Sequence, residues 1–263
     1  MTHPFDGEGL TYGDRLRFWD DLADSYSSVQ QGRIVDDIVC HLSAEGILSP
    51  GSSVLELGSG PGTYSLKVAP LVGDLTCVDS SARMMGRMIT DAGRSGIGNI
   101  MGIVSDFFEL CTDRRFDLVM ATLCPGTGTP EGILRMGSLS RGYCVHIMWI
   151  RNCWDDIHAR IWRALGKEYS FDGRRTDAVS EYLKDTGNDP EVLEFRDRVE
   201  LSMPFGDAVR RESASFAAYG LGAAEVSEAV ENVLSEMRCG ETLRYDGDNA
   251  MRVIIWRPGG GTC

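Results

Sequence analysis

A glycine-rich turn carries the residues of this chain that are best placed to do chemistry. Residues 54–57 (Val-Leu-Glu-Leu) lead directly into residues 58–62 (Gly-Ser-Gly-Pro-Gly), and Asp79 closes a second apolar run 21 positions after Gly58. The pattern predicts a buried strand, a turn whose backbone approaches a ligand, and an acid at the tip of the neighbouring strand. Such an arrangement is typical of a nucleoside-binding pocket, because the acid can bind ribose hydroxyls.

The spacing of the glycines argues against the two common phosphate-binding loops. A nicotinamide fingerprint (Gly-x-Gly-x-x-Gly) that starts at Gly58 needs glycine at position 63, where the chain has Thr63. A phosphate loop ends in Gly-Lys-Ser/Thr, and no lysine follows Gly62. Glu56, just before the turn, would repel phosphate but suits a ligand with an ammonium group. S-adenosylmethionine fits, since it is cationic at sulfur and carries an amino-acid tail and a ribose.

The pattern acid-x-Gly-x-Gly-x-Gly over residues 56–62, with the acid Asp79 downstream, resembles the first two motifs of class I S-adenosylmethionine-dependent methyltransferases. The resemblance extends over roughly residues 15–150. It implies an enzyme that binds S-adenosylmethionine and releases S-adenosylhomocysteine. A module that binds this cofactor without catalysis is an alternative, and so is a nucleotide-dependent oxidoreductase, which the missing third glycine disfavours.

The resemblance also implies cofactor contacts for particular residues. The glycines of the turn would line the methionine end of the cofactor, with Glu56 beneath its ammonium group. Asp79 would accept hydrogen bonds from both ribose hydroxyls, while Asp106 would bind the adenine amino group and Phe107 would pack on the ring. The alternative for each aspartate is a plain cap of the turn or helix that follows. The whole expected set is Tyr26, Glu56, Gly58, Ser59, Gly60, Gly62, Asp79, Ser80, Asp106 and Phe107.

An aromatic segment before the first strand carries a further part of the resemblance. Trp19, Asp20, Ala23 and Tyr26 follow the spacing aromatic–Asp–x–x–Ala–x–x–Tyr of a helix that precedes the first strand in many small-molecule members. There the tyrosine closes over the cofactor, and the negative face of an aromatic ring stabilises a desolvated cation. We therefore expect an N-terminal helical lid with Tyr26 over the sulfonium. Core packing is the alternative for both aromatic residues.

The methyl acceptor is expected at the end of the fourth strand. Residues 121–126 read Ala-Thr-Leu-Cys-Pro-Gly and lack the Asn/Asp-Pro-Pro-aromatic motif of amide-methylating members. Cys124 and His146 are candidates for catalysis, although buried cysteines and lone histidines in apolar strands are more often inert. Methyl transfer from a sulfonium needs no covalent nucleophile, so the catalytic residues stay unknown. Trp19, Trp149 and Trp154 are candidates for binding the acceptor.

Apolar runs alternate with helix-like segments along the chain, which predicts an α/β fold with a parallel sheet covered on both faces. We expect strands near residues 53–57, 75–79, 100–105, 116–122 and 143–150, with a closing strand at 250–258 beside a partner at 192–203. Helices are expected near residues 15–26, 30–46, 63–72, 82–94, 130–140, 154–166, 176–186, 206–219 and 223–237.

The resemblance implies a doubly wound, mostly parallel seven-stranded sheet whose last strand is antiparallel. We expect one domain, residues 1–263, divided into an N-terminal helical cap (1–50), a cofactor-binding core (51–150), a cap or insertion over the cofactor edge (151–190), and C-terminal strands and helices (191–263).

Composition restricts the partners and the compartment. A net charge of −13 opposes polyanions, so a nucleic-acid acceptor is disfavoured. A small or medium-sized acceptor is the leading expectation, and a protein side chain is the alternative. Eight cysteines occur without a Cys-x-x-Cys pair, and the histidine spacing suggests no metal site. No signal peptide or membrane-spanning run is apparent, which favours a cytoplasmic protein.

Overall fold

A computed structural model describes residues 11–23, 33–168, 175–217 and 219–259 of the chain. The strands are β1 (Ser53–Leu57), β2 (Asp74–Asp79), β3 (Ile100–Val104), β4 (Phe116–Thr122), β5 (Ser140–Arg151), β6 (Glu191–Pro204), β7 (Arg238–Cys239) and β8 (Thr242–Trp256). The helices are α1 (Tyr12–Leu22), α2 (Ile34–Ala44), α3 (Ser65–Val68), α4 (Ala82–Arg94), α5 (Pro130–Leu139), α6 (Asp155–Ala164), α7 (Arg175–Asp185), α8 (Phe205–Ala217) and α9 (Ala223–Ser235), with short 3-10 helices η2 (Ala69–Leu71) and η3 (Pro125–Gly128).

The strands form one sheet in the order β3-β2-β1-β4-β5-β8-β6. The first five strands in this order are parallel, whereas β8 runs antiparallel between β5 and β6. The short β7 pairs only with β8. The doubly wound, mostly parallel sheet with an antiparallel last strand is therefore confirmed.

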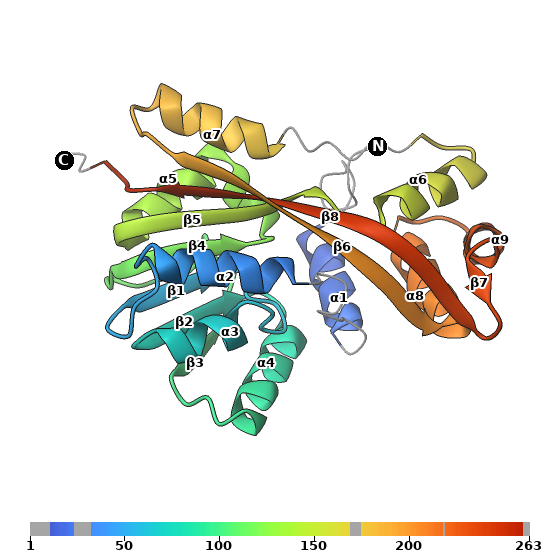
Figure 1. Ribbon diagram of the computed structural model, residues 1–263, viewed down its shortest axis with the longest axis horizontal. Coiled ribbons are helices and arrows are strands. Elements are labelled where there is room, and N and C mark those ends of the chain that lie inside the picture. Colours follow the sequence, from blue (N-terminus) through green and yellow to red (C-terminus); the bar gives the residue numbers. More distant parts are fainter. Residues whose placement is uncertain (1–10, 24–32, 169–174, 218, 260–263) are drawn as a thin grey trace.

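Apolar residues that alternate along the strands cover both faces of the sheet. Val54 of β1 packs in a cluster with α2, α3 and α4, whereas its neighbour Leu55 packs in a second cluster with α5 and α7. This is the period of two that a strand imposes on its side chains. Figure 1 shows α2, α3 and α4 on one side of the sheet and α5 and α7 on the other.

Helix ends follow from local chemistry. The side chain of Ser81 caps α4 by accepting a hydrogen bond from the backbone nitrogen of Met84, and Thr129 caps α5 in the same way from Gly132. Pro130 occupies the first position of α5, where its missing N–H costs nothing. These caps fix the points at which α4 and α5 begin, after β2 and β4, at the same edge of the sheet.

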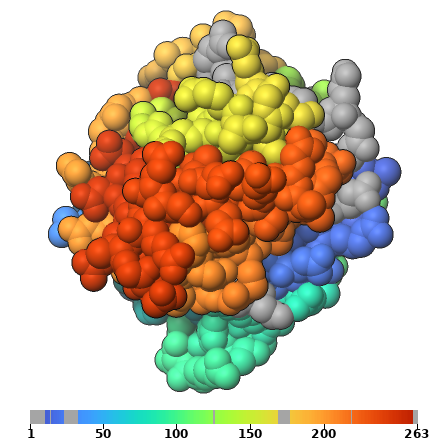
Figure 2. Space-filling model, turned by 90° about the vertical axis from the view of Figure 1, so that its right-hand side faces the viewer, coloured from blue at the N-terminus to red at the C-terminus, as the bar shows by residue number. Residues whose placement is uncertain are grey.

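The C-terminal part of the chain builds a second region with its own core. β5 pairs with residues 250–256 of β8, so residues 242–249 extend past it and pair with β6 and β7. Helices α6, α8 and α9 pack on this extension around a separate apolar cluster that includes Trp154 and Trp162. We call this region, built from α6, α8, α9, β7 and the extended parts of β6 and β8, the C-terminal lobe. It fills one end of the molecule, with α1 at its side (Figures 1 and 2).

Within the described residues, no helix is long and apolar enough to cross a membrane. The seven cysteines of this part of the chain are free thiols.

Candidate functional site

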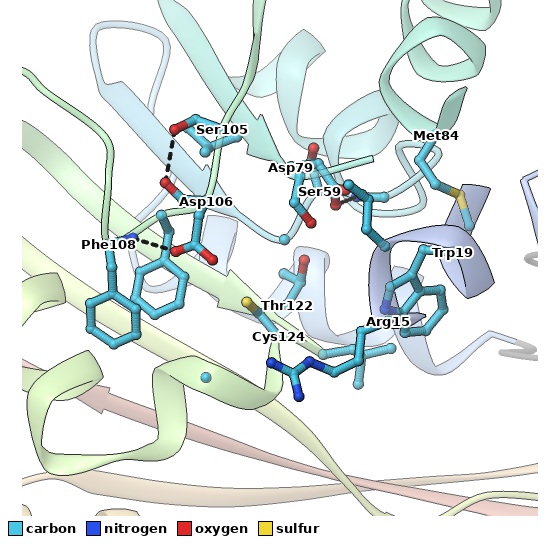
Figure 3. Close-up of a pocket in the computed structure, with 18 of the residues that line it drawn as sticks. Arg15, Trp19, Ser59, Asp79, Met84, Ser105, Asp106, Phe108, Thr122 and Cys124 are labelled. Carbon is cyan, nitrogen blue, oxygen red and sulfur yellow. Dashed lines mark hydrogen bonds between the residues drawn. The ribbon is translucent and has the colours of Figure 1, made fainter. Parts of the chain in front are cut away.

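A cavity of about 550 Å³ opens at the carboxyl ends of the parallel strands. Its walls come from the turn after β1, the ends of β2, β3 and β4, the 3-10 helix η3 and the N-terminal helix α1. Ligands of doubly wound sheets bind at this edge, and the volume lies within the range of small-molecule sites. Figure 3 shows side chains from these separate elements converging on the cavity.

The glycine turn passes unusually close to its neighbours. A Cβ atom on Gly58 would lie 2.6 Å from the Cβ of Cys124, and the φ angle of this residue is +71°. A Cβ on Gly62 would lie 2.6 Å from Cγ of Met88, at a φ of +90°. Only glycine satisfies both the positive φ and the close contact at these two positions. The turn is therefore fixed against the tip of β4 on one side and against α4 on the other.

The backbone amides of the turn are already used within the protein. Gly58 and Ser59 donate to the carbonyl oxygen of Val78, at 2.8 and 3.2 Å. Gly60 donates to Oδ2 of Asp79 at 2.7 Å, and Gly62 donates to the carbonyl oxygen of Ser59 at 3.0 Å. A loop that binds phosphate would point such N–H groups at its ligand. The geometry supports the inference from the glycine spacing that residues 58–62 do not cradle a phosphate.

Asp79 lines the cavity at the end of β2. Its two carboxylate oxygens accept backbone hydrogen bonds from Gly60 at 2.7 Å and Ser81 at 2.8 Å. Burial raises the pKa of this carboxyl, an effect that the two backbone hydrogen bonds oppose. A carboxylate has about four acceptor sites, so two remain for a ligand. Asp79 thus holds the turn in place and still presents acceptors to the cavity, as does the hydroxyl of its neighbour Ser80.

The end of β3 contributes a second acid and two aromatic rings. Asp106, Phe107 and Phe108 all line the cavity, and the two rings lie 4.1 Å apart between centroids. One carboxylate oxygen of Asp106 accepts a hydrogen bond from the backbone nitrogen of Phe108 at 2.8 Å. The remaining carboxylate sites beside an aromatic surface suit a flat ring that carries an amino group (Figure 3).

Glu56 does not face the cavity directly. The residue is fully buried beneath the turn, where its carboxylate accepts hydrogen bonds from Ser65 Oγ at 2.5 Å and Thr122 Oγ1 at 2.7 Å. Burial raises the pKa of Glu56 to about 7, although both hydroxyls oppose the shift. Thr122 itself lines the cavity, so Glu56 is linked to a ligand through this hydroxyl rather than by contact.

Helix α1 closes one side of the cavity, with a face that sequence reasoning identified only in part. Trp19 lines the cavity as expected, and so do Tyr12, Arg15 and Leu16, which were not anticipated. The signal was available, because positions 12, 15, 16 and 19 share one face of a helix. Asp20 anchors α1 by accepting a hydrogen bond from Ser81 Oγ at 2.5 Å, and Tyr26 lies outside the described residues.

The two candidates for catalysis differ in position. Cys124 lines the cavity at the tip of β4, but burial raises the pKa of its thiol to about 12, so it stays neutral. His146 is 1% exposed within β5 and does not line the cavity. Burial lowers the pKa of His146 to about 4, and neither ring nitrogen has a hydrogen-bond partner in the described part of the chain. The geometry favours neither residue as a proton acceptor.

Two of the three tryptophans expected near the acceptor do not reach the cavity. Trp149 lies in β5 opposite Met251 of β8 and packs against the core. Trp154 is 1% exposed and belongs to the core of the C-terminal lobe. No described residue of 151–190 lines the cavity, because α6 joins the lobe and α7 packs against η3, α5 and β5. The described residues also hold no group of three acidic, histidine or cysteine side chains able to bind a metal.

Comparison with known proteins identifies the type of domain. Residues 54–133 match the family model described as "Methyltransferase domain". This segment runs from β1 to the start of α5 and contains the glycine turn, Asp79 and Asp106. A search of curated protein sequences gives no match.

Solved structures show the same fold at low sequence identity. YcgJ of Bacillus subtilis is 12% identical, with a TM-score of 0.53 over 87% of this chain and 99% of that one. A precorrin 8w decarboxylase of Methanobacterium thermoautotrophicum is 13% identical, with a TM-score of 0.50 over 84% and 89%. A magnesium protoporphyrin IX methyltransferase of Synechocystis, solved with bound S-adenosylhomocysteine, is 14% identical, with a TM-score of 0.49 over 95% and 90%. The similarities to YcgJ and to the decarboxylase show the fold, and the family match identifies the domain.

Proposed function

We propose that the protein, whose residues 54–133 match a methyltransferase domain, transfers the methyl group of S-adenosylmethionine to a small or medium-sized acceptor. The observation that carries the proposal is the composition of the cavity at the strand ends. The cavity is lined by the acids Asp79 and Asp106, by the aromatic rings of Phe107 and Phe108, and by a glycine turn whose amides are not free to bind a phosphate.

The residues present fit the cofactor. The free acceptor sites of Asp79 suit the two hydroxyls of a ribose, and Asp106 with Phe107 suits an aminated purine. Glu56 places a buried, ionisable carboxyl behind the turn, where a cationic ligand is favoured over an anionic one. When bound, S-adenosylmethionine supplies an electrophilic methyl group on a sulfonium that leaves as a neutral thioether.

The residues of the chain itself hold the reactants in position and keep water away from them. The tip of β4 brings Cys124 and Leu123 to the cavity, and α1 covers the cavity from the opposite side with Trp19 and Leu16. These apolar groups exclude water from the reacting atoms, and holding two reactants together supplies roughly 7–11 kcal/mol of the barrier in well-oriented systems. The described residues that line the cavity include no activated nucleophile, which agrees with a direct displacement by the acceptor.

The dimensions of the cavity favour a small acceptor. A volume of about 550 Å³ must hold the nucleoside cofactor as well as the group to be methylated. The net charge of −13 opposes binding of a long polyanion. A small molecule therefore fits the cavity better than a nucleic acid or a protein surface does.

A labelled-methyl screen tests this proposal. The protein is incubated with methyl-labelled S-adenosylmethionine and, separately, with small-molecule, protein and RNA fractions of a cell extract. We expect label in a small molecule, and labelling at limiting cofactor that falls by roughly tenfold with Asp79→Asn. Label that enters only the protein or RNA fraction would reject a small acceptor, and turnover in no fraction would favour a cofactor-binding module without catalysis.

A further inference from the structure

The two edges of the sheet differ in how they are protected against pairing with another strand. β3 forms one edge and reads Ile-Met-Gly-Ile-Val, without a charged residue or a proline. β6 forms the other edge and carries the charged residues Glu191, Glu194, Arg196, Asp197, Arg198 and Glu200. Charged side chains on an edge discourage the free backbone groups from pairing with a foreign strand. The edge at β3 lacks this protection.

The free backbone groups of β3 belong to alternate residues. Asn99 and Ser105, which flank β3, each form a backbone hydrogen bond of 3.0 Å to β2. Because backbone groups alternate in direction along a strand, Ile100, Gly102 and Val104 direct their N–H and C=O groups away from β2. In the described part of the chain β3 has no second neighbour, so these groups are open to another strand.

The side chains of this edge are apolar on both faces of the sheet. A Cβ on Gly102 would meet Met85 and Ile89, so the even-numbered residues of β3 face α4. Val104 on that face is 53% exposed, and Met101 on the opposite face is 52% exposed. Figure 1 shows β3 and α4 together at one end of the sheet.

Helix α4 continues the uncharged surface next to β3. Ile89 is 43% exposed, and Ala82, Gly86 and Gly93 lie on the same side of the helix, at spacings of seven, three and four residues from it. All three small residues are exposed, and a Cβ on Gly86 or Gly93 would meet no other atom within 4 Å. We call residues 100–104 and these four residues of α4 the β3–α4 edge.

The charged residues of α4 lie on a different side of the helix. Arg83 is 3.7 Å from an aspartate of α1. Asp91 is 3.7 Å from Arg87 and 3.2 Å from Arg94. A second molecule that contacts the β3–α4 edge therefore meets an apolar surface.

We propose that two copies of this chain pair antiparallel through β3, about a two-fold axis at Gly102. In this register Gly102 lies opposite Gly102 of the second copy, and Ile100 lies opposite Val104 of the second copy. These are the residues whose backbone groups face outward, so each outward N–H and C=O gains a partner in a hydrogen-bonded pair. The same patch serves both copies, as a two-fold interface requires.

The side chains between the outward-facing residues also match under this axis. Met101 lies opposite Ile103 of the second copy, and apolar pairs of this kind stabilise neighbouring strands. The register brings no charged residue of β3 opposite another, because β3 has none.

Helix α4 matches its own copy as well. Gly102 lies beneath Met85 and Ile89, so the axis places Gly86 next to Ile89 of the second copy. Since α4 contacts both β2 and β3 and strands are about 4.8 Å apart, the two helix axes come to about 10 Å from each other, a distance at which helices pack. A strand of an unrelated protein would satisfy the backbone of β3 but not this helix face, which is why a second copy is the occupant.

Sedimentation equilibrium of the whole chain tests the proposal. The wild type should be a dimer in the micromolar range. Val104→Lys places a charge on the β3 edge, and Gly86→Glu places one between the helices at a position where a better helix former replaces glycine. Each should raise the dissociation constant of the dimer at least about tenfold. Val192→Lys makes the same valine-to-lysine change at an exposed position of the β6 edge and should leave the dimer intact.

Cysteine cross-linking tests the register independently of stability. Opposite residues of a non-hydrogen-bonded pair have Cα atoms about 4.5 Å apart, within reach of a disulfide. A double variant, Met101→Cys with Ile103→Cys, should therefore form a covalent dimer on oxidation, seen by non-reducing electrophoresis. Either single variant should cross-link no more than the wild type.

Three results would overturn the proposal. A wild type that stays monomeric throughout the micromolar range would leave the edge to a strand of a different protein. A dimer that Val192→Lys weakens as much as Val104→Lys does would not be specific to β3. A double cysteine variant that cross-links no more than the single variants would exclude pairing about Gly102. Near-ultraviolet circular dichroism of each variant confirms that its fold is intact.

Discussion

Two fully buried glutamates show how differently the two regions of this molecule use charge. Glu212 of the C-terminal lobe lies 2.8 Å from His158 Nε2 and 3.3 Å from Arg211 Nη2. Burial alone would raise its pKa, but these two basic groups outweigh burial and hold the pKa below its ordinary value. Glu56, beneath the glycine turn, accepts hydrogen bonds from the hydroxyls of Ser65 and Thr122 and from the thiol of Cys77, and burial raises its pKa to about 7.

The difference separates a structural charge from one that a ligand can complement. Glu212 is neutralised within its own cluster, where Trp154 stacks beneath Arg211 and beside His158. Glu56 is costly to ionise until a cation approaches, because buried charges need a partner. The buried carboxylate of Glu56, next to the cavity, therefore has uncharged hydrogen-bond donors as its partners. The carboxylate of Glu212, in the lobe, has two basic side chains beside it.

Glycine substitutions should separate the two regions most strongly. Gly58→Ala combines a positive φ with a Cβ placed 2.6 Å from Cys124, so we expect a loss of about 4 kcal/mol of unfolding free energy. The shifted turn should also lower the affinity for S-adenosylhomocysteine by more than about 100-fold, which is about 2.7 kcal/mol. Denaturant unfolding and calorimetry measure the two effects.

The matched variant in the lobe is Gly247→Ala, whose Cβ would lie 2.6 Å from the Cβ of Cys153. It should cost about 2 kcal/mol of stability through overpacking and leave the nucleoside affinity unchanged. If Gly247→Ala weakened binding as much as Gly58→Ala, the two regions would not be independent.

Removal of the lobe's buried charge should act on stability alone. Glu212→Gln leaves Arg211 and His158 without their anionic partner, and we expect a loss of roughly 3 kcal/mol of unfolding free energy, since breaking a buried pair costs more than a surface one. Affinity for S-adenosylhomocysteine should stay within about twofold of the wild type. An unchanged unfolding midpoint would contradict the structural role assigned to this cluster.

The pKa of Glu56 predicts a distinct pH dependence. Because the folded pKa is raised to about 7, the native state holds a proton that the unfolded chain releases near pH 4.5. Stability from this group is therefore present at low pH and lost as pH rises toward 7. Relative to wild type, Glu56→Gln should gain up to about 3 kcal/mol between pH 5 and pH 8. A difference between the two proteins that stays constant with pH would show that Glu56 is ionised throughout.

Asp79→Asn should have the smallest thermodynamic effect and a specific one. The amide keeps one acceptor oxygen but places donors where the backbone N–H groups and the ribose hydroxyls approach. Nucleoside affinity should fall by roughly tenfold, about 1.4 kcal/mol, with S-adenosylhomocysteine and 5′-methylthioadenosine affected equally. Asp117→Asn, at the start of β4 and therefore at the opposite edge of the sheet, is the control and should leave binding unaltered. Unchanged affinity in Asp79→Asn would reduce this residue to a cap of the turn.

The sequence predicted best the residues whose position follows directly from where the strands of a parallel sheet end. Strands β1, β2 and β4 begin and end within about one residue of the predicted ranges, because their apolar runs are bounded by glycine turns and caps. The carboxyl ends of parallel strands lie at one edge of the sheet. The predicted strand ends were therefore enough to predict that Gly58, Asp79 and Asp106 lie at one cavity.

The positions of other residues depend on tertiary contacts that the sequence does not reveal. Arg15 reaches the cavity because Asp20 binds Ser81, 61 positions away, and no local pattern encodes that distance. Trp154 comes three residues after the end of β5 yet packs in the lobe, since residues 242–249 of β8 extend past β5 and the lobe forms on this extension. Glu56 is a predicted cofactor-binding residue, but only the fold shows that its carboxylate binds Ser65 and Thr122 and does not line the cavity.

The identity of the ligand can be tested most directly by titration of the whole chain with S-adenosylhomocysteine, NAD and ATP under identical conditions. The occupied amides of the turn and the acids at the strand ends predict saturable binding of one S-adenosylhomocysteine per chain. They also predict no measurable binding of NAD or ATP. Binding of NAD or ATP as tight as that of S-adenosylhomocysteine, or no binding of S-adenosylhomocysteine, would contradict the assignment of this cavity to a phosphate-free nucleoside cofactor.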